Sequence, residues 1–144
     1  MRLPRTIRLD ASDLEAFEPA AEPGEWAISG AFAFSDREPA LLMGAEHRAF
    51  RAGFLGTRSF GWSSLVSVQE IGEADFEAAV EALARHLLER YNAPDIAAAR
   101  AFAEEEWKFA QSLCERPVGT LIALEREFGP QGIVERFRTV ERPS

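Results

Sequence analysis

A glutamate on the apolar side of a predicted helix is the residue of this sequence best placed to do chemistry. Helical residues turn by about 100° each, and this spacing places Glu106 in the middle of the apolar arc, while Glu104 and Glu105 fall outside it. A carboxylate on an apolar face is either paired with a cation or reaches a cavity. Two roles therefore stay open: a buried ion pair with an arginine of the sheet, Arg58 or Arg126, and a ligand-binding carboxylate in a pocket.

Three further side chains are candidates for the wall of that pocket or for a partner-binding surface. Trp62 and Trp107 would supply aromatic surface, and His47 would supply a titratable ring. Neither His47 nor His86 has a second histidine or carboxylate at metal-binding spacing. The sequence also lacks the motifs of a phosphate-binding loop and of a hydrolase serine elbow. We therefore expect no metal, no cofactor and no catalytic residue.

The composition is typical of a soluble cytoplasmic protein that does not bind nucleic acid. The 144 residues carry a formal charge of -8, which repels phosphate backbones. Cys114 is the single cysteine, as is common in a reducing compartment. No apolar run approaches the roughly twenty residues that span a bilayer, and no apolar core follows the N-terminal arginines as in a signal peptide. We expect one domain over residues 1–144, without membrane contact.

The elements that must position these side chains are arranged around a glycine- and aromatic-rich stretch, Gly53 to Ile71, which reads as a turn followed by a strand. The segments expected before it are a short edge strand at 6–10, a strand at 25–35 and a broken helix at 41–54. One face of the 25–35 strand carries only small residues, among them Ala27, Ala31 and Ala33. We expect the broken helix or a second subunit to cover that face.

Two helices and a hairpin are expected after this stretch. The first helix has Asp75 as its N-cap and runs to about Tyr91, and the second has Asp95 as its N-cap and ends near Cys114. A hairpin of 120–128 and 133–140 closes the chain. Its register follows from chemically matched pairs: Phe128 with Ile133, Arg126 with Glu135, Glu125 with Arg136, Leu124 with Phe137 and Leu121 with Val140.

These elements predict an α+β fold. We expect a two-layer sandwich, in which a mostly antiparallel sheet of about five strands carries two main helices on one face and ends in the C-terminal β-hairpin.

Four segments of the chain resemble a family of small uncharacterised bacterial proteins, found mainly in alphaproteobacteria and classed as a domain of unknown function. The segments are Arg5-Thr-Ile-Arg-Leu-Asp, Ala21-Glu-Pro-Gly-Glu-Trp-Ala, Ala49-Phe-Arg-Ala-Gly-Phe-Leu-Gly and Ser59-Phe-Gly-Trp-Ser. The resemblance covers the whole chain but brings no activity and no site residue. It implies a role in the maturation or assembly of redox metalloenzymes.

Two hypotheses of function follow. The first is an accessory protein without catalytic activity that forms a homo-oligomer or binds a protein partner through its sheet, and that assists the assembly of a redox enzyme. The alternative is a small-ligand-binding domain or enzyme, in which Glu106 and a neighbouring arginine bind a small molecule in an aromatic pocket. The presence or absence of a cavity at Glu106 discriminates between them.

Overall fold

The helices and strands are taken from a computed structural model, which describes residues 1–141. The strands are β1 (Arg2–Ile7), β2 (Ala27–Ile28), β3 (Phe54–Gly56), β4 (Trp62–Ser63), β5 (Leu65–Glu70), β6 (Leu121–Gly129) and β7 (Gly132–Val140). The α-helices are α1 (Ser12–Ala16), α2 (Gly44–Ala52), α3 (Glu73–Arg90) and α4 (Ile96–Leu113), and the 3-10 helices are η1 (Ala31–Phe34) and η2 (Pro39–Leu41). The α+β class is confirmed.

The strands form two antiparallel sheets, where one sheet of about five strands was expected. The larger sheet has the order β1-β5-β6-β7 and the smaller one the order β2-β3-β4. The smaller sheet lies between two sets of apolar side chains. Ala27 and Phe54 pack against Val66 and Ile122 of the larger sheet, whereas Ile28 and Leu55, on the opposite face, pack against the apolar side of α3 and α4.

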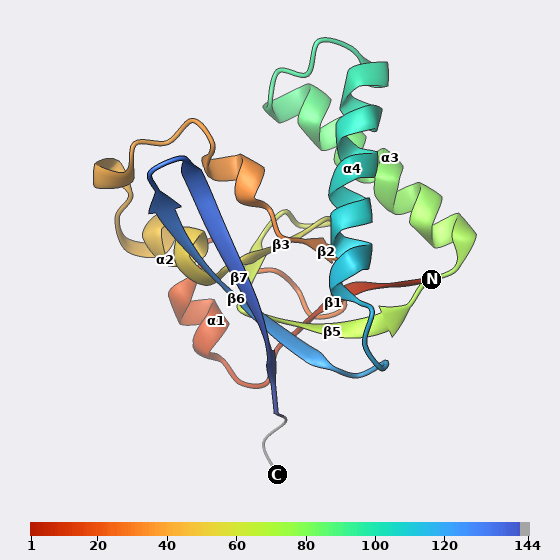
Figure 1. Cartoon of the computed structure of the whole chain (residues 1–144), viewed down its shortest axis with the longest axis horizontal. Coiled ribbons are helices and arrows are strands. Elements are labelled where there is room, and N and C mark those ends of the chain that lie inside the picture. Colours follow the sequence, from red (N-terminus) through yellow and green to blue (C-terminus); the bar gives the residue numbers. More distant parts are fainter. Residues whose placement is uncertain (142–144) are drawn as a thin grey trace.

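The helices occupy two ends of the molecule (Figure 1). The pair α3 and α4 lies together at one end, and α1 and α2 lie at the other, with the hairpin of β6 and β7 passing between them. The carboxylate of Asp95 accepts a hydrogen bond from the Ala98 backbone N–H at 2.8 Å, so the predicted N-cap of α4 is confirmed. In the described residues, none of the helices has the length and apolar character to cross a bilayer.

The hairpin register is confirmed over its whole length. Leu124 lies opposite Phe137, Arg126 opposite Glu135 and Phe128 opposite Ile133. A slip by one residue would move every apolar side chain of β7 to the other face of the sheet, and it would separate the matched pairs Arg126–Glu135, Glu125–Arg136 and Leu124–Phe137.

The predicted strand at 25–35 is wrong beyond Ile28. Gly30 has a φ of 82°, and a Cβ at this position would lie 2.7 Å from the Cβ of Leu55, so the chain turns here and continues as η1. Ala27 is fully buried beneath the larger sheet of its own chain. Ala33, beyond the turn, packs against the core cluster that contains Leu42, Ala49 and Phe50, so residues of the predicted broken helix cover this end of the small-residue set.

Three smaller expectations also need correction. The first strand lies at Arg2–Ile7 rather than 6–10, and the short helix α1 follows it. The organising stretch does not form one strand, because it divides into β3, a turn, β4 and β5. Helix α3 begins three residues earlier than expected, with Gly72 rather than Asp75 as its N-cap, and Asp75 lies in its first turn.

Candidate functional site

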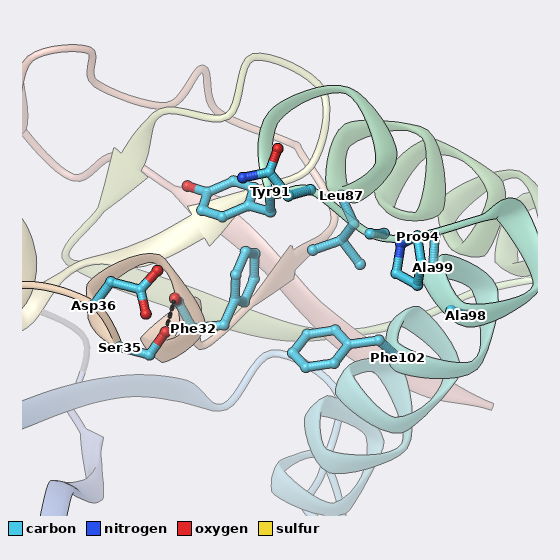
Figure 2. A pocket seen from close by; sticks show the side chains of 11 residues that line it. Phe32, Ser35, Asp36, Leu87, Tyr91, Pro94, Ala98, Ala99 and Phe102 are labelled. Carbon is cyan, nitrogen blue, oxygen red and sulfur yellow. Dashed lines mark hydrogen bonds between the residues drawn. The ribbon is translucent and has the colours of Figure 1, made fainter.

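A groove opens where the corner between α3 and α4 meets the 3-10 helix η1 (Figure 2). It has a volume of about 380 Å³. The residues that line it are Phe32, Ser35, Asp36, Leu87, Tyr91, Asn92, Ala93, Pro94, Ala98, Ala99 and Phe102. We call this hollow the aromatic groove. Its size is in the range of roughly 300–1,000 Å³ that ligand-binding pockets occupy.

The local sequence between α3 and α4 forces the corner that shapes the groove. Helix α3 ends at Arg90, and Asn92 adopts a left-handed φ of 57°, which few residues other than glycine and asparagine tolerate. Pro94 restricts the chain further, and Asp95 then caps α4. The two helices therefore leave the corner close together, and their first and last turns form two walls of the groove.

Aromatic rings from the three elements meet in this groove. The ring of Phe32 contacts those of Tyr91 and Phe102 edge to face, with centroids 5.1 and 5.7 Å apart. Figure 2 shows Phe32 between the other two rings, facing Leu87 and Pro94 across the hollow. Tyr91 is 41% exposed and Phe102 is 44% exposed. Apolar surface of this kind, gathered in a concave site, is typical of a binding site.

The groove has one polar end. Asp36, Ser35 and the Tyr91 hydroxyl lie on the far side of the Phe32 ring from Leu87 (Figure 2). The exposed Asp36 carboxylate makes no ion pair and no side-chain hydrogen bond with residues 1–141. Burial raises the pKa of Tyr91, so its hydroxyl stays protonated at neutral pH. The groove thus offers an apolar hollow beside an uncompensated negative charge.

Arg126 is at the centre of a separate polar cluster, and it is 1% exposed. Its guanidinium uses all five N–H groups. Nε donates to Glu135 at 2.9 Å, Nη1 donates to the carbonyls of Ala49 and Phe50, and Nη2 donates to those of Ser29 and Gly53. The carbonyls of Ala49 and Phe50 belong to the last turn of α2, where helix carbonyls run short of backbone donors, although Ala49 also accepts from the Gly53 N–H. Arg126 therefore caps α2 from the sheet.

Glu106 lies near this cluster without joining it. Its carboxylate makes no ion pair or hydrogen bond with the described part of the chain, because the ion pair of Arg126 is made with Glu135. The pKa of Glu106 is raised to about 7. Burial is the largest cause; the negative charge of Glu135 also raises this pKa, and the positive charge of Arg126 lowers it by a smaller amount. Glu106 is half-buried. It is not part of the aromatic groove.

The other predicted site residues belong to four different segments: β4, α4, α2 and the turn between β3 and β4. The Trp62 ring lies 6.0 Å from the Arg126 guanidinium, close to this cluster. Trp107 is fully buried and donates from its indole N–H to the Ala79 carbonyl at 3.2 Å, which ties α4 to α3. Arg58 is exposed. His47 lies on α2 and lines a shallow hollow against α1. A common pocket for these residues stays a prediction.

A second buried carboxylate, Glu25, was missed in the sequence. It is 2% exposed and accepts four hydrogen bonds, from the backbone N–H groups of Glu22, Arg58 and Ser59 and from the Ser59 hydroxyl. Burial opposes its ionisation, but these donors outweigh burial and lower the pKa of Glu25. The carboxylate holds the turn between β3 and β4 in place. Its role is therefore to fix the loop.

Sequence reasoning also missed the aromatic groove, although part of the signal was present. The break Asn92-Ala-Pro94 between two amphipathic helices indicated a corner, and Tyr91 was placed at the end of its helix. Phe32 was instead assigned to a strand. Only the turn at Gly30 brings Phe32 against the corner.

One family model matches this chain, over residues 1–144, and its description is "Family of unknown function (DUF6505)". No curated protein matches the chain. No solved structure matches it either.

Proposed function

Because this chain belongs to the DUF6505 family, whose function is unknown, we propose a function from its own residues: it is a non-catalytic accessory protein that binds a protein partner in the aromatic groove. The partner segment inserts an apolar side chain between Phe32, Phe102 and Leu87 and places a basic side chain beside Asp36. The exposed Tyr91 and Phe102 rings around a hollow of about 380 Å³ are the observation that supports this proposal.

Charge favours a basic partner segment. Asp36 has no cationic partner among residues 1–141, and the whole chain has a formal charge of -8. A lysine or arginine next to the apolar anchor would compensate the carboxylate at the rim, and the negative field would accelerate association. A redox enzyme under assembly, which the resemblance implies, is one source of such a segment.

A small molecule in the same groove is the second candidate, and the volume of the hollow favours it. It would replace the earlier hypothesis of a ligand at Glu106, since Glu106 does not line this groove. An apolar amine would place its apolar part in the hollow and its positive charge beside Asp36, as the peptide segment would.

Selection of a random peptide library on the immobilised protein tests the proposal. We expect enriched peptides to contain an aromatic or leucine residue adjacent to lysine or arginine. Phe102→Ala should weaken their binding by at least about tenfold, because it removes a central aromatic wall. Asp36→Asn should weaken it by a few-fold, more strongly at low salt.

Phe109→Ala is the matched control, since Phe109 lies on the same helix, is 39% exposed and does not line the groove. It should bind the selected peptides as the wild type does. Equal binding by Phe102→Ala and the wild type would contradict the proposal. If tryptamine binds at the groove in an NMR titration while no peptide is enriched, the small-molecule candidate replaces it.

A further inference from the structure

Strand β7 leaves one edge of the larger sheet open. The order β1-β5-β6-β7 makes β1 and β7 the two edge strands. The outer edge of β1 is occupied, because the Thr6 N–H donates to the Glu25 carbonyl at 2.7 Å and the Gly24 N–H donates to the Thr6 carbonyl at 2.8 Å. Within residues 1–141, β7 by contrast pairs only with β6. Such an edge presents unpaired N–H and C=O groups to which another strand can add.

The open edge is long and regular. All nine residues of β7 lie opposite a residue of β6, with no bulge between Gly132 and Val140. None of them is a proline. Short length, bulges and prolines protect an edge strand from further pairing, and β7 has none of these features. Its charged side chains are the remaining protection, and their sign decides which strand can pair.

The solvent-facing side of this edge is basic. The register places Arg136 and Arg138 on the same side of β7, and both are exposed. Arg136 pairs with Glu127 of β6 at 3.2 Å. Arg138 lies opposite Ala123 and makes no ion pair or side-chain hydrogen bond within residues 1–141. A strand on the open edge would therefore lie beside two arginines, one of which lacks a carboxylate.

These arginines disfavour a second copy of the chain at this edge. Two β7 strands that pair antiparallel about a two-fold axis at Arg136 would place this arginine opposite its own copy. With the axis at Phe137, Arg136 of each strand would lie opposite Arg138 of the other. Like charges directly opposite one another destabilise a strand pair. The edge therefore favours a strand that carries carboxylates.

The other side of β7 suits an apolar side chain. Phe137, between the two arginines in sequence, lies on the opposite side and packs on the core cluster that contains Ile122 and Leu124. It is half-buried and borders, with Leu113 of α4, a hollow of about 310 Å³. An apolar side chain opposite Phe137 would extend this apolar surface. A strand added along 136–138 should therefore alternate acidic, apolar and acidic residues.

We infer that the open edge of β7 is an interaction surface for an extended, acidic segment of a partner protein, which adds to the larger sheet as a fifth strand. Backbone hydrogen bonds to β7 supply the affinity, and the side chains opposite Arg136, Phe137 and Arg138 supply the selectivity. None of residues 132–140 lines the aromatic groove. The inference therefore does not rest on the proposed function.

Titration of the full chain with the peptide Thr-Glu-Val-Glu-Val-Glu-Thr tests this surface, with affinity measured by calorimetry and the β7 amides followed by NMR hydrogen exchange. We expect the peptide to slow the exchange of alternate β7 amides, because every second N–H of an edge strand points outward. The same peptide with lysine in place of glutamate should bind at least about tenfold more weakly. This control is strict, since the formal charge of -8 attracts lysine non-specifically.

Modified peptides test the backbone hydrogen bonds. One peptide is N-methylated at its valines and another at its glutamates. Only alternate N–H groups of a strand point to its partner. One of the two peptides should therefore lose binding and the other should keep it.

Charge-swapped variants locate the site on the protein. Arg136→Glu with Arg138→Glu should prefer the lysine peptide to the glutamate peptide at β7, a reversal that loss of structure alone would not produce. Arg90→Glu, which reverses an exposed arginine of α3, should keep the preference of the wild type. Phe102→Ala, in the aromatic groove, should keep it as well.

The inference is overturned if the glutamate peptide protects no β7 amide, if the two N-methylated peptides do not differ, or if the charge-swapped variant keeps the preference of the wild type. It is also overturned if light scattering shows a dimer whose alternate β7 amides are protected without peptide, because a second copy then occupies the edge. Peptide binding by the aromatic groove is measured separately, so the two proposals fail independently.

Discussion

Replacing Arg126 by methionine is expected to lower the free energy of unfolding by at least about 3–5 kcal/mol, the cost of breaking a buried ion pair by removing one partner. The guanidinium joins the last turn of α2, the segment after β2 and both strands of the hairpin. Methionine fills the space but donates no hydrogen bond. The carbonyls of Ser29, Phe50 and Gly53 would stay buried without this donor, and Glu135 would lose its cation.

Urea denaturation of this variant checks the result, with Arg136→Met as the control. Arg136 is the exposed member of a surface pair with Glu127, with 68% and 58% of the two side chains exposed. Its replacement should change the free energy of unfolding by less than about 1 kcal/mol. Equal effects of the two substitutions would show that the buried hydrogen bonds of Arg126 contribute no more to the free energy of unfolding than a surface ion pair does.

A milder substitution keeps the test informative if the Arg126→Met variant does not fold. Glu135→Gln removes the charge of the ion pair but leaves an oxygen that can accept from Arg126 Nε. We expect a loss of about 1 kcal/mol, the amount by which a hydrogen bond to a charged group exceeds one to a neutral acceptor. The same substitution should lower the pKa of Glu106, because the charge of Glu135 helps to raise it. NMR titration of the Glu106 side chain measures this second effect.

Glu106→Gln is expected to stabilise the protein at alkaline pH and to leave it unchanged at acid pH. The pKa of Glu106 is about 7 in the folded protein and 4.5 without its surroundings. The folded state therefore holds a proton that the unfolded state releases, and stability falls as the pH rises from about 4.5 to 7. Above pH 7 Glu106 is ionised in both states, and its burial then lowers the free energy of unfolding by at most about 3 kcal/mol. Glutamine has no charge to bury, so the penalty disappears.

Thermal or urea unfolding at pH 4.5 and pH 8 measures this difference. Glu104→Gln is the control, because the Glu104 side chain is 52% exposed and contacts Arg100 only at the surface. Its effect should be within about 0.5 kcal/mol at both pH values. A loss of stability in Glu106→Gln at pH 8 would mean that the ionised carboxylate is held by a favourable partner. That result would support the buried ion pair between Glu106 and an arginine that the sequence predicted.

The sequence alone determined the features that depend on neighbours along the chain or on simple periodicity. The β6–β7 register followed from matched pairs across one short turn, and the cap of α4 followed from Asp95 alone. The position of Glu106 on the inner side of its helix followed from the 100° turn per residue. In each case the side chain and the group that constrains it are close in sequence, or the strand period leaves a single choice.

Only the tertiary structure decided which distant segments meet. The alternation at 25–35 was compatible with a strand, but Leu55 leaves no space for a Cβ at Gly30, and the chain turns there. That turn brings Phe32 to the α3–α4 corner and creates the aromatic groove. Arg126 likewise has five hydrogen-bonding partners, and those other than Glu135 lie 73 to 97 residues away along the chain. Contacts at such separations depend on the packing of the whole core, which no local pattern of residues encodes.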